Sequence, residues 1–221
     1  GGYVRRGGRV PPARGGVPAT VPAGKATTLT FPQLGALARP ESGRVTPSGV
    51  IDGRMLFALK RPGDDLSAWL PLRISPEQTV IEAEPNDTAK QASVAKIPGA
   101  LHGVIGKPGD VDRFRVSLKK GQLYQVQVET HTIGSPADIE LILLDPAGKE
   151  VTRADDSGLE EARMNISPPA DGEYILVVKE LVNWGGPEIG RAACRERVWT
   201  WSVPLASTTK HQHTRCWRHR S

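Results

Sequence analysis

The stretch VDRFRVSLKKGQLYQVQVET (111–130) alternates between apolar and polar side chains in both of its halves. Every second residue from Phe114 to Leu118, and again from Tyr124 to Val128, is apolar, and the residues between them are polar. The Lys-Lys-Gly between the two halves is suited to a turn. Alternation with a period of two indicates a strand with one buried and one solvated face, and two such strands joined by a tight turn indicate an antiparallel pair.

More strands are predicted on the C-terminal side of this pair. DIELILLD (138–145) and EYILVVKEL (173–181) are continuously apolar and are predicted as central strands, whereas ARMNI (162–166) is a shorter one. Asp145-Pro146-Ala147-Gly148 is a turn sequence. We find no capped helical pattern of ten residues between these segments, so we expect seven or eight short strands in about 110 residues. This favours an all-β fold, a jelly-roll-like antiparallel β-sandwich. The predicted core is Phe114, Val116, Tyr124, Val126, Val128, Ile139, Leu141, Leu143, Tyr174, Leu176 and Val178.

The N-terminal part is patterned differently. Residues 1–45 are rich in Gly, Pro, Ala and Arg and are predicted to be a linker or a domain fragment of low order, with one strand at KATTLTF (25–31). Within residues 46–76, RMLFALK and SAWLPLRI are predicted to pair as a β-hairpin, the remnant of an upstream β-domain. The sandwich is expected over 77–187, and 188–221 is expected to be a non-native tail.

Charge divides the chain in the same way. The formal net charge is +5 overall, made up of +8 over residues 1–61, −8 over 62–187 and +5 over 188–221. The basic residues lie outside the part predicted to fold, without interleaved aromatic residues, so we expect no nucleic-acid partner. No apolar run is long enough to span a membrane, and no signal peptide is present in this fragment.

Four motifs together resemble the bacterial pre-peptidase C-terminal domain. They are EAEPNDTAKQAS (82–93), GVIGKPGDVDRFRVSLKKGQLYQVQVE (103–129), DIELILLDPAGKEV (138–151) and PADGEYILVV (169–178). The resemblance implies a non-catalytic, jelly-roll-like sandwich that accompanies secreted peptidases and other exported proteins and is often removed during maturation. Well-studied relatives are the collagen-binding domains of clostridial collagenases, which bind calcium. The sequences of these motifs look like those in secreted planctomycete-type proteins, so a secreted or extracytoplasmic location is expected.

Two acidic clusters form a candidate metal site. Glu82 and Glu84 are two residues apart, so on a strand both carboxylates point to one face, and Asn86 and Asp87 follow at a turn. Asp110 and Asp112 are spaced in the same way at the start of an alternating strand. Neither His nor Cys joins them, and oxygen donors of this kind suit Ca²⁺ rather than zinc or copper. The resemblance supports the pairing of the two segments, because its collagen-binding relatives use acidic residues and Asn at matching positions. The alternative is that these side chains cap turns or are solvated.

Three functions remain open from the residues alone. The first is a non-catalytic accessory domain, covalently linked to an upstream domain of its parent protein and stabilised by Ca²⁺. The second is a substrate-binding module for extracellular matrix protein or polysaccharide, for which loop residue Trp184 is a candidate. The third is a fragment of a secreted hydrolase, which would need His102 or His131 beside a carboxylate. No nucleophile or metalloprotease motif supports catalysis, so we expect no enzyme activity.

The C-terminal segment is interpreted as foreign to the domain. EIGRAACRERVW (188–199) closely resembles a translated sequencing adapter, and no strand or helix period follows it. We therefore expect the last strand of the sandwich to be missing, leaving an unpaired edge. The tail carries both cysteines, Cys194 and Cys216. His211, His213, Cys216 and His219 have metal-like spacing, but we expect them to form no organised site.

Overall fold

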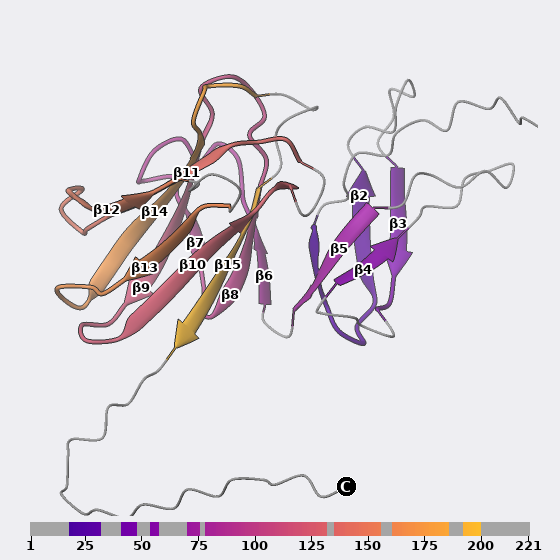
Figure 1. The fold of residues 1–221 in the computed structure, drawn as a ribbon, viewed down its shortest axis with the longest axis horizontal. Coiled ribbons are helices and arrows are strands. Elements are labelled where there is room, and N and C mark those ends of the chain that lie inside the picture. The colour runs from indigo at the N-terminus through magenta and orange to yellow at the C-terminus, as the bar shows by residue number, and fades with distance from the viewer. Residues whose placement is uncertain are drawn as a thin grey trace, which may run out of the picture.

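The computed structural model describes residues 18–31, 41–47, 54–57, 70–75, 78–131, 135–155, 161–185 and 192–199. These residues form fifteen β-strands and no α-helix, so the all-β prediction is confirmed (Figure 1). Among them, no helix has the length and apolar character needed to cross a bilayer.

Two five-stranded sheets form the sandwich, on the left in Figure 1. The sheet that we call the β10 sheet has the order β13 (Arg163–Ile166), β10 (Leu123–Glu129), β15 (Ala192–Trp199), β8 (Gly99–Gly103) and β6 (Gln78–Ile81). The other, the β14 sheet, has the order β12 (Glu150–Ala154), β11 (Ile139–Leu144), β14 (Gly172–Glu180), β9 (Val111–Leu118) and β7 (Ser93–Ala95).

Pairing is antiparallel except at one edge of each sheet, where β6 runs parallel to β8 and β7 runs parallel to β9. The predicted antiparallel sandwich thus has one parallel pair at an edge of each sheet. The reason is that consecutive strands from β6 to β9 alternate between the two sheets. Strands that are neighbours in a sheet are then two steps apart along the chain, and they point the same way.

The sandwich core lies between the two sheets. All eleven residues predicted for it are buried there, and Phe114, Leu141 and Tyr174 are among the largest fully buried side chains. Burial alternates along β9, as the sequence period requires. Complete burial of such a side chain contributes about 1.5–3 kcal/mol, so this layer is the main stabilising feature of the domain. Leu101, Ile105, Met164 and Ile166 also join the core and were not predicted.

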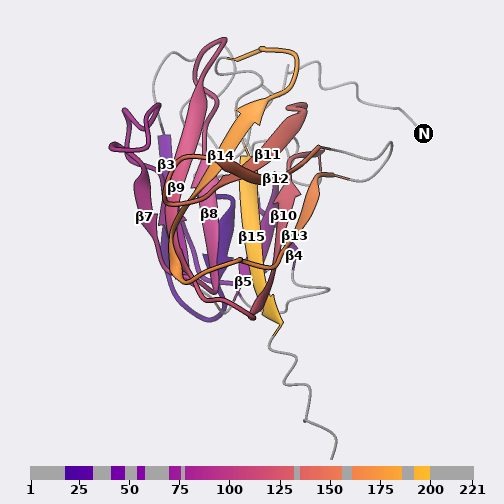
Figure 2. The same ribbon diagram turned by 90° about the vertical axis from the view of Figure 1, so that its left-hand side faces the viewer.

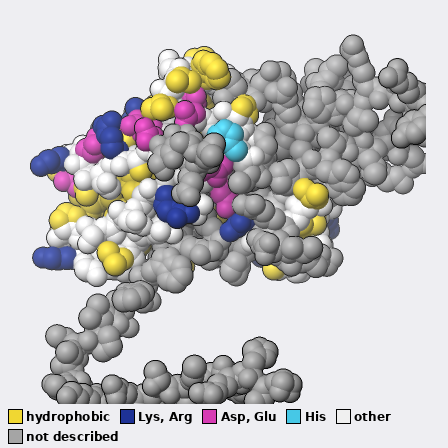
Figure 3. Space-filling view, in the orientation of Figure 1, with side chains coloured by type: hydrophobic (Ala, Val, Ile, Leu, Met, Phe, Trp, Pro, Cys, Tyr) yellow, Lys and Arg dark blue, Asp and Glu magenta, His cyan; other side chains and the backbone are white. Residues whose placement is uncertain are grey.

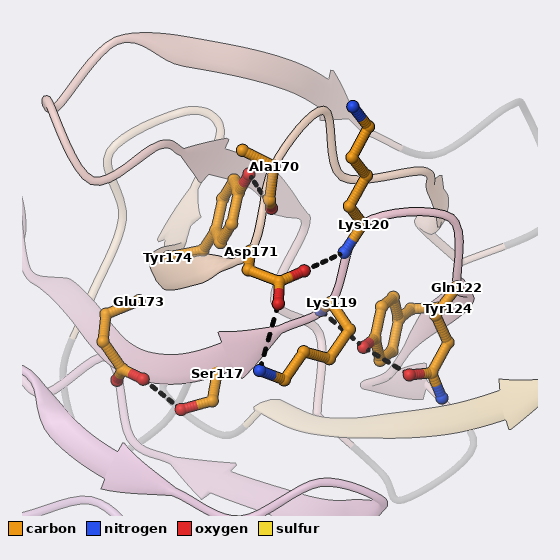
Figure 4. A network of polar contacts seen from close by, with 9 residues as sticks. All are labelled: Ser117, Lys119, Lys120, Gln122, Tyr124, Ala170, Asp171, Glu173 and Tyr174. Carbon is orange, nitrogen blue, oxygen red and sulfur yellow. Dashed lines mark hydrogen bonds and ion pairs between the residues drawn. The ribbon is translucent and has the colours of Figure 1, made fainter.

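Polar contacts close the end of the sandwich where β9 finishes (Figure 4). The Tyr174 hydroxyl donates to the Ala170 carbonyl at 2.9 Å, and the Tyr124 hydroxyl accepts from the Lys119 amide at 2.9 Å. Asp171 accepts from the Lys120 amide at 2.7 Å. Both tyrosines therefore pack inward, as expected, while their hydroxyls are satisfied at the rim. The same contacts tie the β9–β10 turn to the turn before β14.

The upstream unit comprises the described residues between 18 and 75. It contains one sheet of β1 (Thr20–Pro22), β5 (Leu70–Ser75) and β4 (Arg54–Phe57), and a second of β2 (Thr27–Phe31) and β3 (Glu41–Val45). Antiparallel pairing of β4 with β5 confirms the predicted hairpin, and β2 confirms the predicted strand at 25–31. Their connection, residues 58–69, lies outside the described residues.

The prediction of a low-order linker over residues 1–45 is wrong for the parts that the structure describes, 18–31 and 41–45. Three strands lie there, and Val21 and Leu29 are fully buried in a small core with Val45, Leu72 and Ile74. This core draws one or two apolar residues from each of four strands. A cluster assembled in this way leaves no periodic signal in any single segment.

The expected gap in the sandwich is also absent, because Ala192–Trp199 forms β15. In both Figure 1 and Figure 2 this strand lies between β10 and β8, and it pairs antiparallel with each. The backbone groups of β10 and β8 that would otherwise lack partners are thereby satisfied. Backbone pairing needs no side-chain period, and this segment contains no Pro to interrupt it. The adapter origin of the segment stays a prediction, and residues 200–221, with Cys216 and the three tail histidines, lie outside the described part.

Candidate metal centre

The predicted acidic cluster forms where the end of β8 meets the start of β9. The chain leaves β6 at Glu82, whose amide donates to the His102 carbonyl at 2.9 Å and so keeps the segment beside β8. Asp112 lies on β9 opposite Val178, on the same inward face as Phe114. The alternation that buries Phe114 therefore also buries Asp112, and its side chain is wholly inaccessible.

Three carboxylates converge at this point. Oxygen atoms of Glu82, Glu84 and Asp112 all lie within 4.8 Å of one another. Glu82 accepts from the Val104 amide at 2.6 Å and from Asn86 Nδ2 at 3.0 Å. The Asn86 backbone amide donates to the Glu84 carboxylate at 3.0 Å, which helps to fix the loop after β6 beside the cluster.

Several oxygen atoms in the cluster are buried without a partner. Both carboxylate oxygens of Asp112 and Oδ1 of Asn86 have no hydrogen-bond partner. A hydrogen bond between Asp112 and Glu82 forms only if one of the two carboxyls keeps its proton. Buried acceptors of this kind are costly unless a donor or a cation satisfies them. The arrangement is therefore suited to hold either a proton or a cation.

Electrostatics in the cluster favours the neutral forms while no cation is present. Burial, followed by the charge of Glu82, raises the pKa of Asp112 to about 9. Burial also raises the pKa of Glu82, opposed by the hydrogen bond that Asp112 would donate when protonated and by the one from the Val104 amide. A bound cation would reverse both shifts, because it favours the ionised carboxylates.

Gly103 makes room for the cluster. A Cβ atom at this position would lie 2.3 Å from Asp112 Oδ2 and 3.0 Å from Glu82 Oε2. The last residue of β8 must therefore lack a side chain if the two carboxylates are to stay in place. Neither Gly103 nor the Val104 amide was singled out from the sequence, because their role depends on contacts with distant segments.

The other two predicted ligands lie around a lysine. Asp87 Oδ2 is 3.6 Å from Lys107 Nζ, and Asp110 Oδ1 is 3.8 Å from the same atom. Asp110 also accepts from the Gly106 amide at 2.5 Å. The structure thus brings Glu82, Glu84, Asn86 and Asp112 together, and it places Asp87 and Asp110 against Lys107. Their roles as ligands stay predictions.

The two histidines that a hydrolase would need lie elsewhere. His102 is fully buried and its Nδ1 accepts from the Ala19 amide at 3.4 Å. His131 is exposed, and its Nδ1 lies 4.0 Å from Glu161 Oε1 and 3.5 Å from Thr130 Oγ1. In a catalytic triad the nucleophile and the carboxylate contact opposite nitrogens of the imidazole ring. Here both contact the same nitrogen, so this trio does not have triad geometry.

Fold and site together define a two-sheet β-sandwich domain with a cluster of three carboxylates, one of them fully buried, at one end. Residues 110–180 match the family model described as the bacterial pre-peptidase C-terminal domain. The resemblance inferred from the sequence motifs is confirmed over this range.

A curated relative is a probable subtilase-type serine protease of Deinococcus radiodurans, 38% identical over 99 residues. The match covers 43% of this chain and 14% of the relative, so the chain spans a small part of that protein. Among solved structures, the pre-peptidase C-terminal domain of a collagenase from Bacillus anthracis matches at 14% identity with a TM-score of 0.40, over 52% of this chain and 99% of that one. A periplasmic inhibitor of g-type lysozyme from Aeromonas hydrophila matches at 18% identity with a TM-score of 0.34, over 54% and 96%.

Proposed function

We propose that the sandwich is a non-catalytic accessory domain of an exported bacterial protein of the peptidase-associated type, and that Ca²⁺ stabilises it. Glu82, Glu84, Asn86 and Asp112 would supply the side-chain ligands. The observation that carries the proposal is the full burial of Asp112 beside two further carboxylates, with neither of its oxygens hydrogen-bonded. Asp87 and Asp110 would join only if Lys107 moved away from them.

The donor set favours calcium over other metals. Every side-chain donor in the cluster is a carboxylate or amide oxygen, and such hard donors suit Ca²⁺ or Mg²⁺. Calcium accepts six to eight oxygens in irregular geometry, which four side chains completed by backbone carbonyls or water can provide. Magnesium prefers a regular octahedron and keeps several waters, so it would use few of the side-chain oxygens that converge here.

The comparisons support the accessory role. The matched relative is a probable serine protease of which this chain corresponds to a small part. The partner of the domain would then be a covalently linked upstream domain of its own parent protein. A secreted or extracytoplasmic location follows from the same proposal.

Calcium should raise the melting temperature of the chain. At a hundredfold excess over its dissociation constant, an ion that binds only the folded state stabilises by about 2.7 kcal/mol. The full chain is melted in millimolar Ca²⁺, in millimolar Mg²⁺ and in chelator.

Two variants and a control test whether the cluster is responsible. Asp112→Asn should abolish the response to Ca²⁺, and Gly103→Ala should weaken it by displacing two carboxylates. Asp171→Asn, which removes a carboxylate at the far end of β9, is the control and should respond like the parent. Coincident melting curves with and without Ca²⁺ would refute calcium binding.

A second candidate function, a module that binds an extracellular polymer, is favoured by one surface feature. Leu181, Val182 and Trp184 are exposed in the loop after β14, and hydrophobic side chains gather at the top of Figure 3, where Figure 1 places this loop. The Trp184 backbone amide donates to the Glu180 side chain at 2.6 Å, which ties the loop to the end of β14. Gly185 packs so closely on Lys107 that a Cβ atom would lie 2.1 Å from its backbone.

Trp184→Ala should reduce retention of the chain on insoluble collagen or polysaccharide at least severalfold if the loop binds a polymer. A large exposed aromatic side chain supplies much of the contact energy of such a surface. Leu123→Ala removes an exposed apolar residue from the start of β10 and is the matched control. Equal retention of the parent and Trp184→Ala chains would favour the accessory role alone.

A further inference from the structure

One face of the sandwich contacts the upstream unit through backbone and side-chain hydrogen bonds. The Ala19 amide donates to Nδ1 of His102 on β8 at 3.4 Å. The Thr79 hydroxyl on β6 donates to the Thr20 carbonyl at 3.2 Å. Ala19, Thr20 and His102 are all buried, and Thr79 is half-buried.

An ion pair joins a third strand of the same sheet to the upstream unit. Arg73 Nη1 on β5 lies 3.5 Å from Glu129 Oε1 at the end of β10. The two side chains are only 14% and 6% exposed. Removing one member of a buried pair leaves the other charge buried and uncompensated, which is far more costly than losing a surface pair.

Burial along β10 shows where the contact begins. Its odd-numbered residues from 123 to 127 alternate with the core residues, and the exposure of residues 123, 125, 127 and 129 decreases from the start of the strand to its end. Leu123 is exposed, Gln125 and Gln127 are half-buried, and Glu129 is buried. The outer face of the sheet is therefore open at one end and covered at the end that carries the ion pair.

We propose that Thr79, His102 and Glu129 form a docking surface built for the upstream unit, and that the upstream unit and the sandwich unfold as one cooperative body. Domains within one chain move relative to each other by default, unless their interface is large and hydrophobic. A buried ion pair that spans the junction works against such motion, because it is satisfied only in the docked arrangement. The sandwich thereby holds the unit that precedes it in a fixed orientation. The proposal is independent of calcium.

Hydrogen exchange measured by mass spectrometry in increasing urea tests this on the full chain. Peptides from β1 and β5 report on the upstream unit, and peptides from β9 and β10 report on the sandwich. In the parent chain both sets should open at the same urea concentration. In Arg73→Gln and in Glu129→Gln, the upstream peptides should open first, with exchange in low urea faster by roughly a hundredfold. In the double variant, exchange in the upstream peptides should be accelerated less than the effects of the two single variants combined, because no charge is left unpaired.

Glu140→Gln is the matched control. Glu140 is also buried and ion-paired, to Arg153 at 3.0 Å and Lys179 at 2.6 Å, but all three belong to the β14 sheet. Loss of the Glu140 charge should lower the urea concentration at which the peptides open, by the same amount for the upstream unit and the sandwich. Earlier opening of the upstream unit in the parent chain, or additive effects of the two single variants, would overturn the proposal. If a charge variant does not fold, Thr79→Val must loosen the upstream peptides selectively, and failure to do so also overturns it.

Discussion

Val126→Asp should lower the free energy of unfolding by several kcal/mol and shift the melting temperature of the chain accordingly. Val126 is 1% exposed in the middle of β10, where it packs in the sandwich core. A carboxylate there would have no charge partner, and burying an unpaired charge is among the most costly changes that a core can suffer. Thermal or urea unfolding followed by circular dichroism measures the effect.

Gln127→Asp is the control on the same strand. Residue 127 points to the opposite face and is half-buried, and it pairs across the sheet with the exposed Arg163. A carboxylate at this position stays solvated beside a cation, so the variant should melt close to the parent. If Val126→Asp also melts within about a degree of the parent, position 126 is not part of the packed core.

The calcium-free chain should lose stability as the pH rises from about 4 toward 9. The pKa of Asp112 is raised from its ordinary value of 3.8 to about 9 in the folded chain. Between these values the folded state holds a proton that the unfolded state has released, so stability falls with increasing pH. Burial opposes ionisation of Asp112, so releasing this proton in the folded chain lowers the free energy of unfolding. Melting temperatures in chelator at pH 5, 6, 7 and 8 measure it.

Two comparisons identify Asp112 as the source of the effect. Asp112→Asn replaces the protonated carboxyl with a neutral group of similar shape and should flatten the dependence on pH in chelator. Saturating Ca²⁺ should do the same in the parent chain, because the ion replaces the proton. A parent chain whose stability in chelator rises between pH 5 and pH 8 would contradict the assignment.

Part of the candidate site could be predicted from spacing. Asp112 lies two residues before Phe114, so the alternation along β9 places both side chains on the inward face. Glu82 and Glu84 follow the end of β6 and reach Asp112 through the loop after that strand, not through strand geometry. The different position of Asp87 and Asp110 could not be predicted in this way. Lys107, which lies between them, reaches both through the folding of a loop, and loop conformation leaves no periodic signal.

Local sequence determined the strands of the sandwich and the residues in its core. Side chains in a strand alternate strictly between two faces, so the apolar phase of residues such as Val126 and Leu176 fixes which face is buried before any partner strand is known. Turn sequences such as Asp145-Pro146-Ala147-Gly148 mark the ends of the strands for a similarly local reason.

Only the tertiary structure decided which strands pair and how far the fold extends. The position of β15 between β10 and β8 depends on two backbone edges far away in the sequence, and such pairing is nearly indifferent to side chains. The parallel edges arise because the chain alternates between sheets, and the upstream core is assembled from four strands that each contribute one or two apolar residues. Each of these features depends on contacts between distant segments, and no pattern within a single segment of the sequence specifies them.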